Sequence, residues 1–285
     1  MNNPMPVFIG NFRSGTTLVA NLLGFHSELA LWFETKGFCE ALRWLRVLES
    51  PETLEFESRR VQPVDLPGFT AEAVTARMRV DFRQTNARIS GQIGSGKGGH
   101  EFYPLGHDRV AYLPSEAENE LDRWYEDVRS DPVPPVIRAA TGKLISNLGA
   151  MHAARTGRPV WVNKTPEIPR FASELRSCIG PCRIVMMMRE SSEVVRSAVS
   201  MGWAEEHEIA DWWQGMVNES REAAREDPAN YREIHYEALL CDPIPVLNEL
   251  LDFIGVRANG ELLVQEFEKR LPPGGRSLMG PIARR

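Results

Sequence analysis

Cysteine, lysine and long apolar runs are all scarce in this chain of 285 residues. The 4 cysteines form no C-x-x-C pair, so we expect neither a zinc site nor a disulfide framework. Apolar runs such as Ile184–Met188 are far too short to cross a bilayer, and residues 1–6 lack the basic start of a secretory signal. We therefore expect a reduced, cytoplasmic protein with no membrane span.

Basic residues are also outnumbered, because the chain has 33 lysines and arginines and 39 acidic residues, which gives a net charge of −6. Long nucleic acids require a broad basic surface, so nucleic acid is not expected as a partner. The hydrophobic fraction of 42% and the charged fraction of 25% are ordinary for a globular protein of this length. Any anionic ligand is then expected to be small and to be bound by a few local cations.

What the chain does contain is an alternation of strand and helix patterns. Short apolar runs that end at polar residues predict strands at 6–10, 159–162, 182–188 and 231–235. Helical patterns follow each of them, at about 18–23, 167–178, 189–200 and 244–254. This order predicts an α/β protein with three layers and a central, mostly parallel sheet. Ligands of such sheets bind at the carboxyl ends of the strands.

The alternation is interrupted from about residue 50 to residue 131, where prolines are frequent and glycines cluster. We interpret this segment as an insertion with one or two helices in a single domain that spans residues 1–285, and we expect the insertion to bind a substrate. Helical patterns resume over residues 115–128, 136–154 and 204–226.

Two glycine-containing segments are candidates for phosphate binding. Gly91–Gly98 matches G-x-x-x-x-G-K, but no buried strand precedes it and no helix follows, so we interpret it as a chance match, with a substrate lid as the alternative. Gly10–Thr17 lacks the lysine but lies between a predicted strand and a predicted helix. Backbone N–H groups, the helix dipole and the Thr16 and Thr17 hydroxyls converge on an anion there. Arg13 is suited to bind the same oxygens bidentately.

The run Arg13-Ser14-Gly15-Thr16-Thr17 after a short strand resembles the 5′-phosphosulfate loop of sulfotransferases that use 3′-phosphoadenosine 5′-phosphosulfate (PAPS). It is most similar to the branch shared by tyrosylprotein sulfotransferases and many bacterial enzymes. Arg189 and Ser197 resemble that family's strand-R-x₇-S element, which holds the 3′-phosphate of the donor. Lys164 lies in a segment similar to the K-x-P element that reaches the sulfuryl group, and Tyr236 begins a Y-E-x-L element whose tyrosine contacts adenine.

One element departs from the family pattern. The cytosolic branch covers the 3′-phosphate with a basic R-K-G loop, and the nearest candidate here is Arg276, which has no adjacent lysine. Arg276 is therefore the least supported of the donor-binding residues that the resemblance implies.

The resemblance also suggests the catalytic base. Glu34 follows Arg13 by 21 residues, which is the gapless spacing of the glutamate base in the tyrosylprotein-like branch. Cytosolic members use a histidine instead, so His100 and His107 stay open as alternatives, whereas we expect a structural role for His26.

Together these features imply a PAPS-dependent sulfotransferase with a P-loop-like fold. It would transfer a sulfuryl group in line to a hydroxyl of a small-molecule, lipid or sugar acceptor, free or carrier-tethered, and release adenosine 3′,5′-bisphosphate (PAP). The implied catalytic residues are Glu34, Arg13 and Lys164, with no metal. The implied donor-binding residues are Arg13, Ser14, Gly15, Thr16, Thr17, Arg189, Ser197, Tyr236 and Arg276. The alternative is a phosphate-loop kinase of a nucleoside or small metabolite. The acceptor and the oligomeric state stay open.

Overall fold

The computed structural model describes residues 4–53, 70–89 and 113–270. In this part of the chain, five strands form one parallel sheet in the order β2-β3-β1-β4-β5. The strands are β1 (Val7–Gly10), β2 (Leu29–Phe33), β3 (Val160–Lys164), β4 (Arg183–Met188) and β5 (Tyr231–His235). The predicted α/β class with a central parallel sheet is confirmed.

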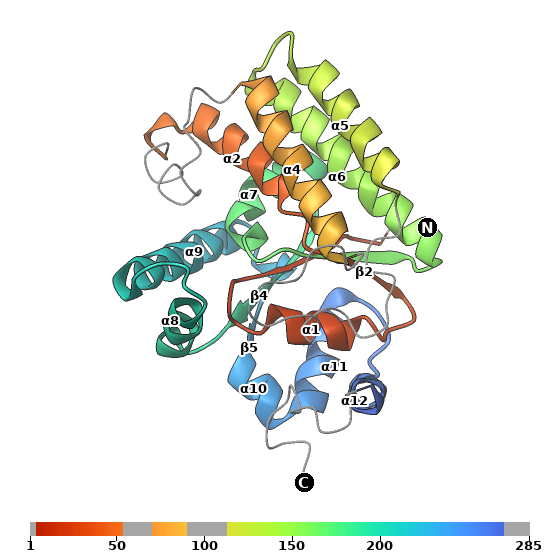
Figure 1. The fold of residues 1–285 in the computed structure, drawn as a ribbon. Coiled ribbons are helices and arrows are strands. Elements are labelled where there is room, and N and C mark those ends of the chain that lie inside the picture. Colours follow the sequence, from red (N-terminus) through yellow and green to blue (C-terminus); the bar gives the residue numbers. More distant parts are fainter. Residues whose placement is uncertain (1–3, 54–69, 90–112, 271–285) are drawn as a thin grey trace.

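Helices cover both faces of this sheet (Figure 1). They are α1 (Thr16–Leu23), α2 (Gly37–Glu49), α4 (Ala71–Ile89), α5 (Pro114–Val128), α6 (Pro134–Thr156), α7 (Ala172–Ile179), α8 (Ser191–Ser200), α9 (Glu206–Glu226), α10 (Tyr236–Cys241), α11 (Pro243–Ile254) and α12 (Gly260–Lys269). Helices α5 and α6 each begin with a proline at the first helical position, where the missing N–H has no helical partner to lose.

Strand β1 shows how the sequence divides the core into layers. Its side chains alternate, so Phe8 joins one buried cluster while Val7 and Ile9 join another. The Phe8 cluster is filled by α2, α4, α5, α6 and α7, and the other by α1, α11 and α12. A third cluster packs α8 and α9 near β4. Figure 1 shows the two groups of helices on opposite sides of the sheet.

The four strands predicted from the sequence are all present, but β2 was missed. Its five residues are all buried and form a short continuous apolar run, separated from α1 by residues 24–28. Periodicity alone cannot distinguish such a run from a segment of a buried helix. The predicted helix at 167–178 starts later than expected, because Ile168–Phe171 forms a 3₁₀ turn before α7. Helices α2 and α12 were not anticipated, and α4 was expected only as one of the one or two helices of the insertion, without bounds.

Two helices of the predicted insertion lie in the described residues. Buried side chains of α4 and α5, such as Met78, Phe82 and Trp124, belong to the same cluster as those of α2 and α6. The bounds of the domain and of its insertion stay predictions. None of the described helices is long and apolar enough to cross a membrane.

Candidate active site

The loop between β1 and α1 lies at the centre of the sheet's carboxyl edge, since β1 is flanked by β3 and β4. Asn11 and Arg13 have φ angles of 93° and 53°, and Gly15 has 87°, so three residues of the loop are left-handed. Such a conformation costs a non-glycine residue about 1–2 kcal/mol. The Asn11 Nδ2 donates to the Met187 carbonyl at 2.8 Å and its N–H to the Pro166 carbonyl at 2.7 Å. These bonds tie the loop to both neighbouring strands.

Gly15, the residue before α1, is in close contact with Tyr236 at the start of α10. A Cβ at Gly15 would lie 2.3 Å from the Tyr236 Cδ2, so only glycine fits at this point. The fold thus brings the predicted adenine contact against the predicted phosphosulfate loop. Ser14 is buried, and its hydroxyl donates to the Phe12 carbonyl at 3.2 Å, while Thr16 and Thr17 form the first turn of α1.

Two arginines meet beside this loop. The Arg13 Nε and Nη2 donate to the Ser197 Oγ at 3.0 and 2.8 Å, and the Arg189 Nη1 donates to the Arg13 carbonyl at 3.1 Å. The Arg189 guanidinium also lies 4.7 Å from the Tyr236 ring centre. Four residues predicted to bind the donor, from α8, α10 and two loops, are therefore linked by successive contacts.

Positive charge at this point is only partly balanced by protein carboxylates. Burial and the neighbouring Arg189 lower the pKa of Arg13, against the opposing effect of Glu34. Arg13 forms no ion pair within residues 4–53, 70–89 and 113–270, and Arg189 reaches only Glu193, at 3.3 Å. The Arg189 Nε is buried without an acceptor in the same residues. An anion at this place would satisfy these donors.

Aromatic side chains lie beside Arg13. The Arg13 guanidinium lies 5.6 Å from the ring centre of Trp203, and the stacked rings of Phe12 and Trp212 have centres 4.3 Å apart. Trp203 itself is exposed.

The second half of the site is built where β2 and β3 end. Phe33 pairs in register with Lys164, and the N–H of Glu34 donates to the Lys164 carbonyl at 2.7 Å. The Lys164 Nζ donates to the Glu34 Oε1 at 2.5 Å and lies 4.2 Å from the Phe33 ring centre. Lys164 is only 1% exposed, and this burial lowers its pKa, while Glu34 acts to raise it.

Sequence reasoning missed several residues that support this site. Asn11 is one of them. Its position in a glycine-containing loop was a usable signal, because asparagine tolerates the left-handed φ that such loops require. Asn163 and Thr165 are others: the Asn163 Nδ2 donates to the Thr35 Oγ1 at 2.6 Å, and the Thr35 N–H donates to the Thr165 Oγ1 at 3.1 Å. These bonds fix the residue after Glu34, and no local pattern reveals them.

The remaining predicted residues divide into two groups. His26 has the structural role expected, because its buried ring bonds the Arg257 carbonyl at 2.9 Å. Arg276, His100, His107 and the Gly91–Gly98 segment lie outside the described residues. Within the described ranges, no group of three or more His, Cys, Asp or Glu side chains is placed to hold a metal ion.

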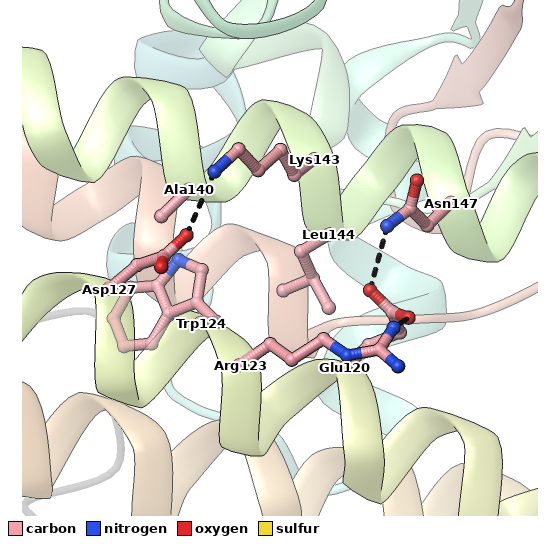
Figure 2. A pocket seen from close by; sticks show the side chains of 8 residues that line it. All are labelled: Glu120, Arg123, Trp124, Asp127, Ala140, Lys143, Leu144 and Asn147. Atoms are coloured by element: carbon pink, nitrogen blue, oxygen red, sulfur yellow. Dashed lines mark hydrogen bonds and ion pairs between the residues drawn. The ribbon is translucent and has the colours of Figure 1, made fainter.

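A separate hollow lies between α5 and α6 (Figure 2). Its polar groups pair with each other, because the Lys143 Nζ donates to the Asp127 Oδ2 at 3.1 Å and the Asn147 Nδ2 to the Glu120 Oε2 at 2.9 Å. Since those groups are already engaged, we assign no ligand to this hollow.

Comparison with known proteins agrees with the geometry. A sequence model of the sulfotransferase family matches residues 6–259. No curated protein sequence matches the chain. The sulfotransferase STF9 from Mycobacterium avium is similar in structure, with a TM-score of 0.52 and 12% identity over 98% of this chain and 71% of that one. STF1 from Mycobacterium tuberculosis has a TM-score of 0.50 and 16% identity over 93% and 70% of the two chains. At these identities the likeness shows a shared fold.

Proposed function

The chain belongs to the sulfotransferase family, and from that premise we propose that it transfers a sulfuryl group from PAPS to an alcohol. The observation that carries this proposal is the pair of arginines, Arg13 and Arg189, beside the Gly15–Thr17 helix start, with Glu193 as the only carboxylate that pairs with either of them in the described residues. PAPS is a compact polyanion of the kind such a site attracts. The family match favours this reaction over the kinase alternative.

In this proposal the loop and its arginines bind the donor. The N–H groups at the start of α1 and the hydroxyls of Thr16 and Thr17 bind the 5′-phosphosulfate. Arg189 and Ser197 bind the 3′-phosphate, and Tyr236 contacts the adenine. The hydroxyl of Ser197, which accepts from Arg13 in the structure, is close enough to that arginine to share one phosphate with it.

The Glu34 and Lys164 pair performs the transfer. The Glu34 carboxylate takes the proton of the acceptor hydroxyl while its oxygen attacks sulfur, and the bond between sulfur and the bridging phosphate oxygen breaks. Lys164 and Arg13 stabilise the negative charge that develops on the bridging and sulfuryl oxygens. PAP and the sulfated acceptor leave, and the proton on Glu34 passes to solvent. Arriving sulfuryl oxygens give the Lys164 ammonium a second partner and leave Glu34 available to the acceptor.

The acceptor is proposed only as a class, namely a small-molecule, lipid or sugar hydroxyl, free or carrier-tethered. A cytoplasmic location and a contribution of Arg276 to the 3′-phosphate site stay predictions.

Nucleotide binding is the first test. PAP is expected to raise the melting temperature by about 5 °C at a concentration 100 times its Kd, whereas ATP with Mg²⁺ is expected to leave it unchanged. Arg189→Gln should abolish the PAP effect. Arg196→Gln is the matched control, because Arg196 is exposed on α8 and, like Arg189, pairs with Glu193. Stabilisation by ATP and not by PAP would contradict the proposal.

Group transfer is the second test. Purified enzyme with radiolabelled PAPS is offered a panel of phenols, sugars, sterols, long-chain alcohols and carrier-bound hydroxy acids. Label should pass to one of these classes, and omission of Mg²⁺ or addition of a chelator should not slow the transfer.

A further inference from the structure

Glu34, the proposed base, has a main chain in an unfavourable conformation. Its φ angle is 38°, in the left-handed region that costs a side chain such as glutamate about 1–2 kcal/mol. A residue at the end of a strand would otherwise stay extended and send its side chain in another direction. The conformation therefore needs contacts that hold it in place.

Both main-chain polar groups of Glu34 are bound from opposite sides. Its N–H donates to the Lys164 carbonyl at 2.7 Å, which continues the ladder between β2 and β3. Its carbonyl accepts from the Thr85 Oγ1, also at 2.7 Å. Thr85 lies 51 residues further along the chain, near the end of α4.

The packing of α4 on α2 brings Thr85 to this point. A Cβ at Gly37 would lie 2.7 Å from the Phe82 Cε2, so glycine at the start of α2 lets the two helices approach closely. The rings of Phe38 and Phe82 meet edge to face, with centres 5.6 Å apart. Thr85 is 7% exposed, so its hydroxyl has little access to water. Figure 1 shows α4 beside α2.

We propose that Thr85 is a positioning residue for the sulfuryl transfer, in that its hydroxyl holds the main chain of Glu34 in the left-handed conformation that directs the carboxylate to Lys164. The proposal rests on the function proposed above, because it assigns Glu34 the role of base. It also gives the helix α4 a place in catalysis. Loss of the hydroxyl lets Glu34 relax to an extended conformation and moves its carboxylate away from the Lys164 ammonium.

The donor half of the site should not respond to this change. The hydrogen bonds that join Arg13, Arg189 and Ser197 involve no atom of α4. A variant at Thr85 should therefore reduce the rate of transfer and leave PAP binding intact.

The titration of Lys164 reports the position of the Glu34 carboxylate without substrate. Burial lowers the pKa of Lys164, Glu34 raises it, and Lys36 and Arg13 lower it slightly. Removal of the carboxylate from the ammonium therefore lowers that pKa further. The chain has only five lysines, so ¹³Cε-lysine labelling gives a resolvable spectrum in which Lys164→Arg identifies the signal of interest.

The decisive variant is Thr85→Val, which keeps the shape and removes the donor. We expect the pKa of Lys164 in Thr85→Val to fall most of the way to its value in Glu34→Gln, and the pKa in Thr85→Ser to match the wild type. Thr75→Val is the matched control, because the buried Thr75 of the same helix donates only to the Ala71 carbonyl, at 2.6 Å. It should not change the titration.

An unchanged Lys164 titration in Thr85→Val would overturn the proposal, and so would an equal fall in Thr75→Val. If the panel yields an acceptor, Thr85→Val should lower kcat about tenfold with KM for PAPS within about twofold, and Thr85→Ser should restore kcat. A protein that shows the expected titration but neither binds PAP nor transfers sulfate would refute the proposed function and leave the contact established.

Discussion

The two halves of the site differ in how their charge is balanced. On the donor side, Arg13 and Arg189 lie together with no carboxylate closer to Arg189 than 3.3 Å, and Arg189 keeps a buried Nε without an acceptor in the described residues. On the base side, Lys164 and Glu34 are joined at 2.5 Å. The first half is balanced only in part, because Arg13 has no ion pair in the described residues, whereas the second half is balanced within the protein. Excess positive charge, rather than burial alone, is therefore the feature by which we propose the place of an anionic ligand.

This difference predicts opposite effects on stability when each half loses its charged residue. Removal of a cation from the donor side relieves repulsion, while removal of the carboxylate from the base side leaves a buried ammonium poorly paired. The following experiments test that contrast, and the largest effect is given first.

Arg13→Ala should lower the transfer rate about 10³-fold, because it removes a donor aimed at charge that develops in the transition state. The melting temperature of the ligand-free protein should stay level or rise, since the repulsion from Arg189 is gone. Initial rates and calorimetry measure both quantities, with Arg196→Ala as the exposed control. A marked loss of stability in the free protein would mean that Arg13 is structural.

Glu34→Gln should lower the transfer rate about 10²-fold through loss of the base. Here the free protein should lose about 2 kcal/mol of stability, because the buried Lys164 keeps only a neutral partner. The stabilisation by PAP should persist. If full activity remained, the base would have to be sought elsewhere, with His100 and His107 as the next candidates.

Gly15→Ala should destabilise the protein by about 2 kcal/mol and weaken PAP binding about tenfold, since the new Cβ would collide with Tyr236. Gly157→Ala is its control. Gly157 has a similar left-handed φ of 68°, but nothing lies within 4 Å of a Cβ there. The control should lose about 1 kcal/mol and bind PAP normally. Equal affinity in the two variants would place the nucleotide away from the loop.

Asp81→Asn tests an effect that is confined to stability and depends on pH. Burial, chiefly, and the nearby Glu40 raise the pKa of Asp81 from 3.8 to about 6, with Glu167 acting in the same direction and Lys36 and Arg43 against it. A raised folded-state pKa gives stability that is full below pH 3.8 and is lost as the pH rises through 6. Asp81→Asn should therefore gain about 3 kcal/mol over the wild type at pH 7.5 and little at pH 4. Denaturation at the two pH values measures this gain, and a constant difference would contradict it.

The strand, loop and helix of the donor side could be predicted from the sequence because their signals are local. A short apolar strand, a glycine loop and a helix stripe lie within residues 7–23, and each later strand ends in its own polar residues. The sequence did not show which of these strand ends lie next to one another. Arg13 and Ser197 are separated by 184 residues, and only the packed sheet brings them to 2.8 Å.

The base side was harder to predict because its geometry depends on β2, a run of five buried residues without the alternation that identifies a strand. The spacing from Arg13 was enough to predict Glu34 as the base. Its contact with Lys164, however, follows from the register in which Phe33 of β2 pairs with Lys164 of β3. The Thr85 bond depends on α4, which carries no motif. A threonine inside a helix has many possible roles, and only the docking of α4 on Gly37 singles this one out.

The central place of β1 has a consequence for how the molecule is made. It is the first strand of the described sheet to leave the ribosome, yet its two neighbours pair with it through residues 162–164 and 183–186. A nascent chain therefore carries β1 with both edges open until β3 has been synthesised, and Arg13 cannot bond Ser197 until residue 197 has emerged. Assembly of the Arg13–Ser197 contact is thus a late event of translation, and a truncation before β3 leaves both edges of β1 open for aggregation.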